Sequence, residues 1–132
     1  MRKIKFRAQG RASGNWYYGY LTYQSKHYCI VEENGNVVEI DPRTIGQYTG
    51  LKDCEGNKIY EGDILKVTNE KGWSRLFVVE YNEDAAGFIL DYSYKTGDTS
   101  QNIDFDCDYA FQSEKLGNIH EDEYLLETEN EE

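Results

Sequence analysis

The segment from Thr44 to Val67, TIGQYTGLKDCEGNKIYEGDILKV, constrains the fold more than any other part of the sequence. Its glycines recur at intervals of four to six residues, at Gly46, Gly50, Gly56 and Gly62. Glycine enters tight or left-handed turns without a steric penalty from Cβ, so the chain must bend repeatedly here. Apolar and aromatic residues between the glycines predict turns that pack against a core. We predict a hairpin tip at Gly56-Asn57 and, at Gly62-Asp63, a turn that leads into a strand from Ile64 to Thr68.

Alternation of apolar and polar residues predicts strands along most of the remaining chain. In the first of them, apolar Ile4, Phe6 and Ala8 alternate with basic residues, which predicts one apolar and one basic face. Further strands are expected over residues 16–23, 27–33, 36–40, 75–81, 87–94, 103–111 and 116–120. The chain contains 12 Tyr, 5 Phe and 2 Trp, and aromatic residues favour pleated, half-buried surfaces over helices.

Two local signals specify turns between these strands. Asn34-Gly35 predicts a hairpin between residues 27–33 and 36–40, with a type I′ turn in which both central residues have φ > 0. Asp41-Pro42 predicts one helical turn, because Asp caps a helix N-terminus and Pro suits its first position. That turn must end before Gly46.

The expected fold is mainly β: a single compact barrel-like or sandwich-like meander of short antiparallel strands with one or two short helical turns. A chain of 132 residues fits one domain, which we place at residues 1–120. Residues 121–132 form an acidic C-terminal tail with seven acids and no base. Such a composition is typical of a solvated or frayed end, so partial order is the most that we expect of it.

Three motifs of the chain resemble the YopX family of small phage and prophage proteins. They are the central segment Thr44–Leu65, the N-terminal Ile4–Ala8 and the C-terminal Gly117–Glu121. The chain departs from the family pattern at Gln9, where an aromatic residue is usual, and at Glu123, where a proline is usual. The resemblance implies a bacteriophage-derived protein of the host cytoplasm that forms a homo-oligomer, and it carries no assigned activity and no catalytic residues.

Charge is distributed unevenly along the chain. Residues 1–31 hold six bases and no acid (+6), whereas residues 32–132 hold eight bases and 25 acids (−17). The split indicates either a nucleic-acid contact by the basic part or its ion pairing with the acidic remainder, in the same subunit or a neighbouring one. Our candidate interaction surface consists of Lys3, Lys5, Arg7 and Tyr17.

Nucleic-acid binding is the first alternative for this basic part. Bases beside exposed aromatic rings can bind single strands, and the nearby aromatic residues are Trp16, Tyr17, Tyr18, Tyr20 and Tyr23. The competing interpretation is that the rings fill a small core and the bases pair with acids. The acidic remainder favours the second interpretation because it repels phosphate. Mimicry of DNA by the acidic surface is a further hypothesis, although acidity commonly serves solubility.

The sequence offers few residues in the patterns that metal sites need. Asp104, Asp106 and Asp108 suggest calcium, but an EF-hand loop needs Gly and Glu where this chain has Tyr109 and Lys115. We therefore expect solvent-facing carboxylates on a strand.

His27 and Cys29 are one close pair, with His120 distant in sequence, which is too few ligands for a structural zinc site. A catalytic dyad of His27 and Cys29 would need a bulge or loop to bring the side chains together. The three cysteines, Cys29, Cys54 and Cys107, are expected to be reduced and mostly buried. We predict no catalytic, cofactor-binding or metal-binding residue, and no cofactor.

The longest apolar runs of the chain are four residues long, far below the roughly 20 that a membrane-spanning helix needs. The N-terminus has no apolar block of the kind found in signal peptides. We therefore expect a protein of the bacterial host cytoplasm without a membrane partner. The predicted function is a non-enzymatic, oligomeric interaction module that contacts host or phage macromolecules. The alternatives are a nucleic-acid-binding or DNA-mimicking regulator and an enzyme of unrecognised type.

Overall fold

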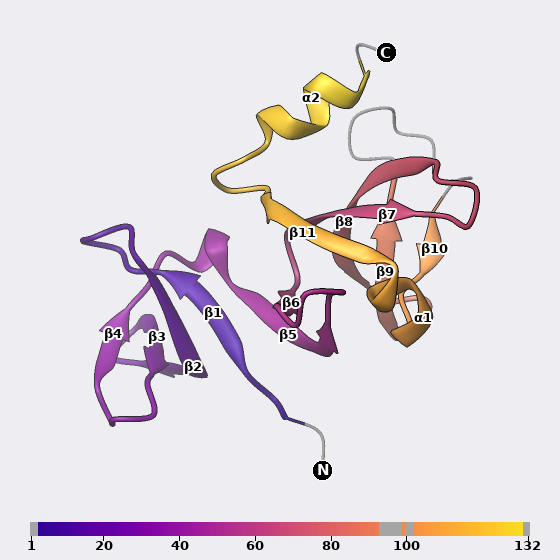
Figure 1. Ribbon diagram of the computed structural model, residues 1–132. Coiled ribbons are helices and arrows are strands. Elements are labelled where there is room, and N and C mark those ends of the chain that lie inside the picture. The colour runs from indigo at the N-terminus through magenta and orange to yellow at the C-terminus, as the bar shows by residue number, and fades with distance from the viewer. Residues whose placement is uncertain (1–2, 93–98, 100–101, 131–132) are drawn as a thin grey trace. The chain divides into compact units, whose positions relative to one another are not determined.

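The computed structural model describes residues 3–92, 99 and 102–130 (Figure 1). It divides into two compact units, Met1–Gly50 and Leu51–Glu132. The first unit contains strands β1 (Phe6–Gln9), β2 (Trp16–Gln24), β3 (His27–Val31) and β4 (Val37–Glu39), the 3₁₀ turn η1 (Pro42–Thr44) and the start of β5 (Gly46–Lys52). The second contains β6 (Lys58–Tyr60), β7 (Asp63–Thr68), β8 (Ser74–Asn82), β9 (Gly87–Asp91), β10 (Ile103–Asp104), α1 (Cys107–Phe111), β11 (Ser113–Asn118) and α2 (Tyr124–Asn130).

The strands of the first unit form an antiparallel sheet in the order β4-β3-β2-β1-β5. Its core consists of Ala8, Ile30 and Ile40, against which Phe6, Tyr17, Leu21, Val38 and Ile45 pack. The strand register places Ala8 opposite Tyr17 and Leu21 opposite Ile30, so these core residues lie on one face. Gly19 lies on the same face, where a Cβ would collide with the backbone carbonyl of Val31.

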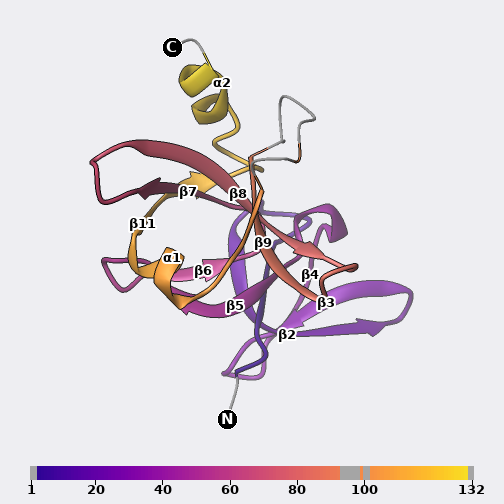
Figure 2. The same ribbon diagram turned by 90° about the vertical axis from the view of Figure 1, so that its right-hand side faces the viewer.

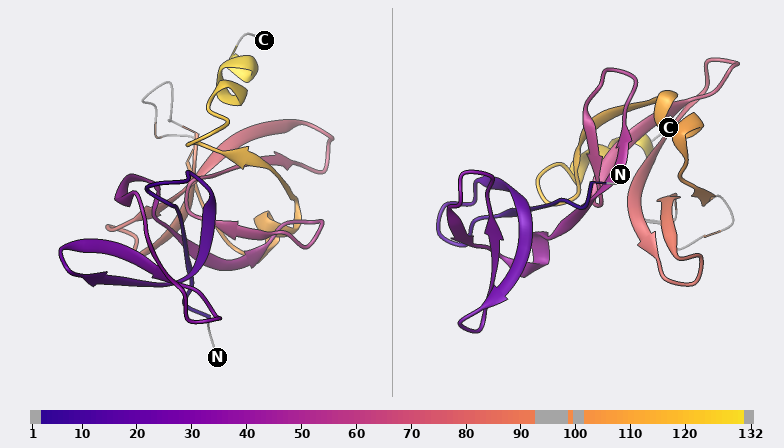
Figure 3. Two further views of the ribbon diagram at one scale, coloured as in Figure 1. Left: turned by 90° about the vertical axis from the view of Figure 1, so that its left-hand side faces the viewer. Right: turned by 90° about the horizontal axis from the view of Figure 1, so that it is seen from below.

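Two hairpins connect β2 to β4, and Figure 3 shows the β2–β3 hairpin as a long two-stranded ribbon. Its turn is Ser25-Lys26, with φ of 52° and 68°, which is the positive-φ pair that a type I′ turn needs. The predicted Asn34-Gly35 hairpin is confirmed, but its type I′ geometry is wrong. There Gly35 alone takes a positive φ, 90°, because the loop closes with a 2.9 Å hydrogen bond from the Gly35 N–H to the Glu32 carbonyl. The predicted helical turn at Asp41-Pro42 is confirmed as η1, which Asp41 caps.

The second unit is built on an antiparallel sheet in the order β10-β9-β8-β7-β11, and Figure 2 shows β11 lying beside the β7–β8 hairpin. Strand β5 runs past Gly50 into this unit and turns at Asp53–Asn57 into β6, which confirms the hairpin predicted at Gly56-Asn57. The turn at Gly62-Asp63 is also confirmed, with φ of 93° at Gly62 and β7 starting at Asp63.

The strand predicted over residues 103–111 is wrong beyond its first two residues. β10 covers only Ile103–Asp104, and helix α1 follows at Cys107–Phe111. Asp106 causes the change, because its side chain accepts the Tyr109 N–H at 3.0 Å and so caps the helix. The predicted strand at 116–120 is observed as β11 (Ser113–Asn118), which starts three residues earlier and ends two residues earlier. Of the strand predicted at 87–94, β9 ends at Asp91, and Tyr94 lies outside the described residues.

The two faces of this sheet pack against different parts of the second unit. One face carries Leu65, Val67, Phe77, Val79 and Leu90, which pack with Ile59 and with Ala110 of α1. On the other face, Ile64 and Val78 contact Leu126 of α2. Leu126 is 6% exposed, so the acidic tail contains a docked helix rather than only solvated chain. The docking uses two of the tail's few apolar residues, because Leu125 packs against the same cluster as Leu126.

The mainly β prediction is confirmed: two antiparallel sheets with short helices. Each sheet, over the described strands, ends in two edge strands and does not close into a barrel. The predicted single domain at 1–120 stays a prediction. Within the described ranges, no helix has the length and apolar character that crossing a membrane requires.

Candidate functional site

The four residues of the predicted interaction surface do not share one exposed face. Lys3 is exposed, but the Lys5 side chain is 17% exposed and its Nζ lies 3.3 Å from Glu33 Oε1. Arg7 is 3% exposed, with its guanidinium carbon 4.7 Å from the centre of the Trp16 ring. Because Arg7 pairs with Tyr18 in the strand register and Ala8 pairs with Tyr17, Arg7 and Tyr17 lie on opposite faces of the sheet.

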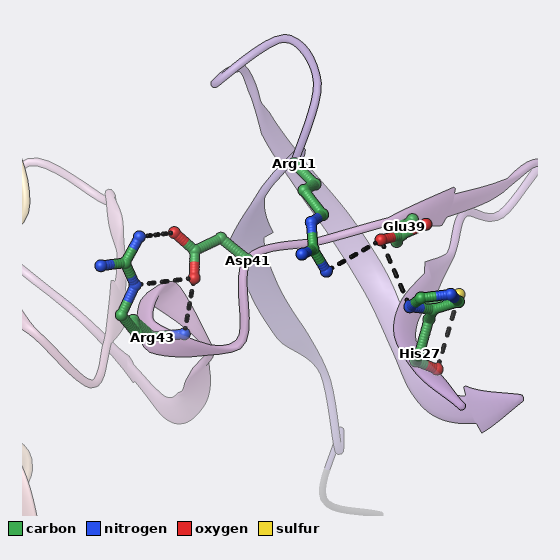
Figure 4. A network of polar contacts seen from close by, with 6 residues as sticks. Arg11, His27, Glu39, Asp41 and Arg43 are labelled. Carbon is green, nitrogen blue, oxygen red and sulfur yellow. Dashed lines mark hydrogen bonds and ion pairs between the residues drawn. The ribbon is translucent and has the colours of Figure 1, made fainter.

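Several basic side chains of the first unit pair with acids of the same unit (Figure 4). Arg11 Nη1 lies 3.1 Å from Glu39 Oε2, and His27 Nδ1 lies 3.4 Å from the same oxygen. Arg43 binds Asp41 through two side-chain hydrogen bonds of 3.1 and 2.9 Å. These hydrogen bonds, with the one from the Arg43 backbone, hold the pKa of Asp41 below its usual value. This geometry matches the interpretation in which the basic part pairs with acids.

The outer face of the first sheet carries a different surface, which we call the tyrosine face: Tyr18, Tyr20, Val31 and Val37. Tyr18 is 46% exposed, Tyr20 63% and Val37 53%. The register connects them, because Tyr20 pairs with Val31 and Val31 with Val37. The face therefore crosses β2, β3 and β4 on the side opposite the core.

Sequence reasoning named Tyr18 and Tyr20 among the aromatic residues but did not separate them from Tyr17. The separation follows from the alternation of side chains along β2, once Ala8 and Ile30 mark which face is buried. Tyr23 and Tyr28 belong to the core-side set and form an edge-to-face pair with ring centres 4.9 Å apart near the hairpin turn.

The three aspartates considered for calcium take separate structural positions. Asp104 ends β10, Asp106 caps α1 and Asp108 lies in the first turn of that helix. They therefore do not alternate along one strand. Over the part of the chain that the structure describes, no group of three or more His, Cys, Asp or Glu side chains is arranged to hold a metal ion.

His27 and Cys29 lie on the same face of β3, and the Cys29 thiol donates to the His27 backbone carbonyl at 3.9 Å. His120 is in the turn after β11, in the second unit. All three cysteines are free, as expected, but the prediction that they are mostly buried is wrong, since Cys54 and Cys107 are exposed.

Cys54 is held in its thiol form by its surroundings. Desolvation and the negative charges of Asp53, Glu55 and Glu114 raise the pKa of its thiol. Because the thiolate is the nucleophile, the arrangement lowers the reactivity of this exposed cysteine.

The acids of the central motif organise the backbone of the second unit. Asp53 accepts the backbone N–H groups of Glu55, Asn57 and Lys115 at 3.0, 2.8 and 2.9 Å. Desolvation acts to raise the pKa of Asp53, but these hydrogen bonds outweigh it and the pKa is lowered. Asp63 is fully buried, accepts the Tyr60 N–H at 2.7 Å and pairs with Lys115 Nζ at 3.3 Å. The motif is therefore a structural connection.

Glu80 on β8 lies beside the carboxyl group of Asp91 on the neighbouring strand β9, and its pKa is raised. Desolvation, followed by the hydrogen bond with Asp91 and the negative charges of Asp91 and Glu61, raises the pKa of Glu80 to about 7. Paired acids with displaced pKa values occur at catalytic sites, but also in purely structural networks. The signal in the sequence was weak, because acids are abundant throughout the chain.

Comparisons with known proteins identify the fold and the family. The family described as YopX protein matches residues 5–127. The crystal structure of protein EF1440 from Enterococcus faecalis is similar, with a TM-score of 0.58 and 23% sequence identity over 96% of this chain and 99% of that chain. At this identity the similarity concerns the fold alone. No curated protein matches the chain.

Proposed function

The chain belongs to the YopX family, and we propose that it is a non-enzymatic, homo-oligomeric interaction module. In this proposal it is an accessory protein of phage origin that works in the bacterial cytoplasm. The observation that carries the proposal is the tyrosine face, an exposed aromatic and aliphatic strip on the outer side of the first sheet.

The chemistry of the tyrosine face suits a protein contact. Tyrosine is enriched at the energetic centres of interfaces, because it offers a large apolar ring, a polar hydroxyl and few rotatable bonds. Tyr20 exposes 63% of its surface, and the exposed β-branched Val37 lies on the same face, on the far side of Val31. Burial of such side chains in an interface is favourable by about 25 cal/mol per Å² of apolar surface, before the cost of association is subtracted.

Charge favours a second copy of this chain as the partner, in a head-to-tail arrangement. The first unit, residues 1–50, has seven bases and four acids (+3), and the second, residues 51–132, has seven bases and 21 acids (−14). Contact between two first units would bring like charges together, whereas contact with a neighbour's second unit pairs opposite charges. Head-to-tail contacts generate closed rings when the rotation between subunits closes.

Sedimentation velocity of the full chain tests this proposal. We expect the wild-type protein to sediment as an oligomer, more weakly at high salt because charge complementarity is screened. Tyr18→Ser/Tyr20→Ser should shift it to the monomer. The matched control is Tyr23→Ser, which removes a ring that is 62% exposed on the opposite face of the same strand β2 and should leave assembly intact. A wild-type monomer at all concentrations, or an oligomer that both variants preserve, would contradict the proposal.

A further inference from the structure

A cavity of about 260 Å³ opens in the second unit, on the α1-facing side of the sheet. Its lining combines aromatic and apolar side chains with one cation and a few polar groups. The lining includes Trp73, Arg75, Phe77, Tyr109 and Gln112. Arg75 and Phe77 occupy alternate positions at the start of β8, so the pleat directs both side chains to the same face, and Trp73, which immediately precedes β8, also lines the cavity.

We propose that this cavity binds a single nucleobase that carries a 5′-phosphate, taken either from a free nucleotide or from a single strand. This goes beyond the proposed function, because the cavity and the tyrosine face share no residue and belong to different units. Small-molecule sites are mostly apolar, with a few placed polar groups, and usually occupy about 300–1,000 Å³. This cavity, of about 260 Å³, lies just below that range, which suits one ring system and not a dinucleotide.

The aromatic residues supply the surface on which a base would stack. Trp73 is 76% exposed at the edge of the cavity, so its ring presents an uncovered π-face, and Tyr109 lines the cavity as well. Base–aromatic stacking contributes about 1–3 kcal/mol per base and tolerates any base, because every base has a π-face. Gln112 and Ser74 add amide and hydroxyl groups that can hydrogen-bond the edge of a base.

Arg75 supplies the positive charge that a phosphate requires. Its guanidinium carbon lies 5.0 Å from the centre of the Tyr92 ring, a cation–π contact that fixes its position beside the cavity. Guanidinium groups recognise phosphate through paired hydrogen bonds. The segment that lines this side of the cavity is also locally basic: residues 67–79 contain Lys71 and Arg75 but only Glu70 (+1), in a unit of net charge −14.

Isothermal titration calorimetry on the full chain tests the proposal, with adenosine 5′-monophosphate, adenosine and a single-stranded oligodeoxyadenylate as probes. Trp73→Ala should weaken nucleotide binding by about ten-fold or more, and Trp73→Phe should restore it because the ring is kept. Arg75→Met should weaken nucleotide binding by about ten-fold and leave adenosine binding unchanged, since it removes a charged hydrogen bond to the phosphate alone.

Lys66→Met is the matched charge control. Lys66 is exposed on the opposite face of β7, one residue before the cavity residue Val67, so its loss should leave nucleotide affinity unchanged. Binding of the mononucleotide with this variant pattern supports a free nucleotide as the source, and the same pattern with the oligonucleotide alone supports a single strand. The proposal is overturned if neither the nucleotide nor the oligonucleotide binds at millimolar concentration, or if Trp73→Ala and Arg75→Met leave binding unchanged.

Discussion

Glu80 makes the stability of the second unit depend on pH near neutrality. Its carboxyl group is half-buried on β8, and desolvation together with Asp91 and Glu61 raises its pKa from 4.5 to about 7. Because the folded pKa lies above the unfolded one, the folded state binds the proton more tightly. The stability that the proton contributes is fully present below about pH 4.5 and is lost as the pH rises through about 7.

The magnitude follows from the difference between the two pKa values. The change from 4.5 to about 7 corresponds to about 3 kcal/mol, at 1.36 kcal/mol per pH unit. Glu80 is only half-buried, so solvent screens the repulsion and lowers the expected loss to about 1–2 kcal/mol. A neutral side chain of the same shape, as in Glu80→Gln, removes this loss because it never becomes charged.

Urea unfolding of the wild-type chain and of Glu80→Gln, at about pH 5 and about pH 8, measures the effect. We expect the two proteins to be nearly equally stable at the lower pH and Glu80→Gln to be more stable by about 1–2 kcal/mol at the higher pH. Glu83→Gln, in the exposed turn between β8 and β9, removes one acid without a buried partner and controls for net charge. A stability difference between Glu80→Gln and the wild type that does not change with pH would refute the reasoning.

Two further substitutions test the contacts of the second unit by urea unfolding. Leu126→Ala should destabilise the chain by about 2 kcal/mol, because it empties the contact of α2 with Ile64 and Val78, and the loss of far-UV helical signal should accompany it. Asp63→Ala should cost about 3 kcal/mol or more, because it removes the buried acceptor of the Tyr60 N–H and the carboxylate partner of the Lys115 ammonium, which retains the Lys58 carbonyl at 3.0 Å; a cost under about 1 kcal/mol would contradict the importance of this ion pair.

Local signals with a single physical solution were predictable from the sequence. Gly56 and Gly62 adopt φ of 86° and 93°, which glycine alone adopts without strain, so the turns of the central motif could be placed to the residue. Asp41-Pro42 likewise combined a capping side chain with a preset φ. In each case the residue type restricts the backbone independently of its surroundings.

The structure of segments in which local signals compete with one another could not be predicted from the sequence. The alternation from Ile103 to Phe111 is typical of a strand, but the cap at Asp106 and packing of Ala110 into the core select a helix. The type I′ turn formed at Ser25-Lys26, a pair without Gly or Asn, because the register of β2 with β3 imposes it. These outcomes depend on tertiary contacts that the local sequence does not contain.

Prediction of the candidate interaction surface was limited for the same reason, because it also depends on tertiary contacts. The alternating pattern of the sequence places Lys5 and Arg7 near the aromatic residues of β2. The depth at which Arg7 is buried, however, depends on packing. A basic residue that stacks on Trp16 at 3% exposure serves the structure of the first unit. The tyrosine face could be located only when the register had fixed which side of β2 is covered.

The contacts of Lys115 show that the role of the central motif differs from the roles of the two proposed surfaces. Asp53 binds its backbone N–H and Asp63 its ammonium group, so two acids ten positions apart in the motif hold one residue of β11. The similarity of this motif to the family therefore reflects the contacts that stabilise the second unit. The tyrosine face lies wholly outside the motif, and of the cavity's lining residues only Val67 falls within it. Substitution of Asp53 or Asp63 should thus reduce stability. Substitution of Tyr20 should reduce assembly alone, and substitution of Trp73 should reduce ligand binding alone.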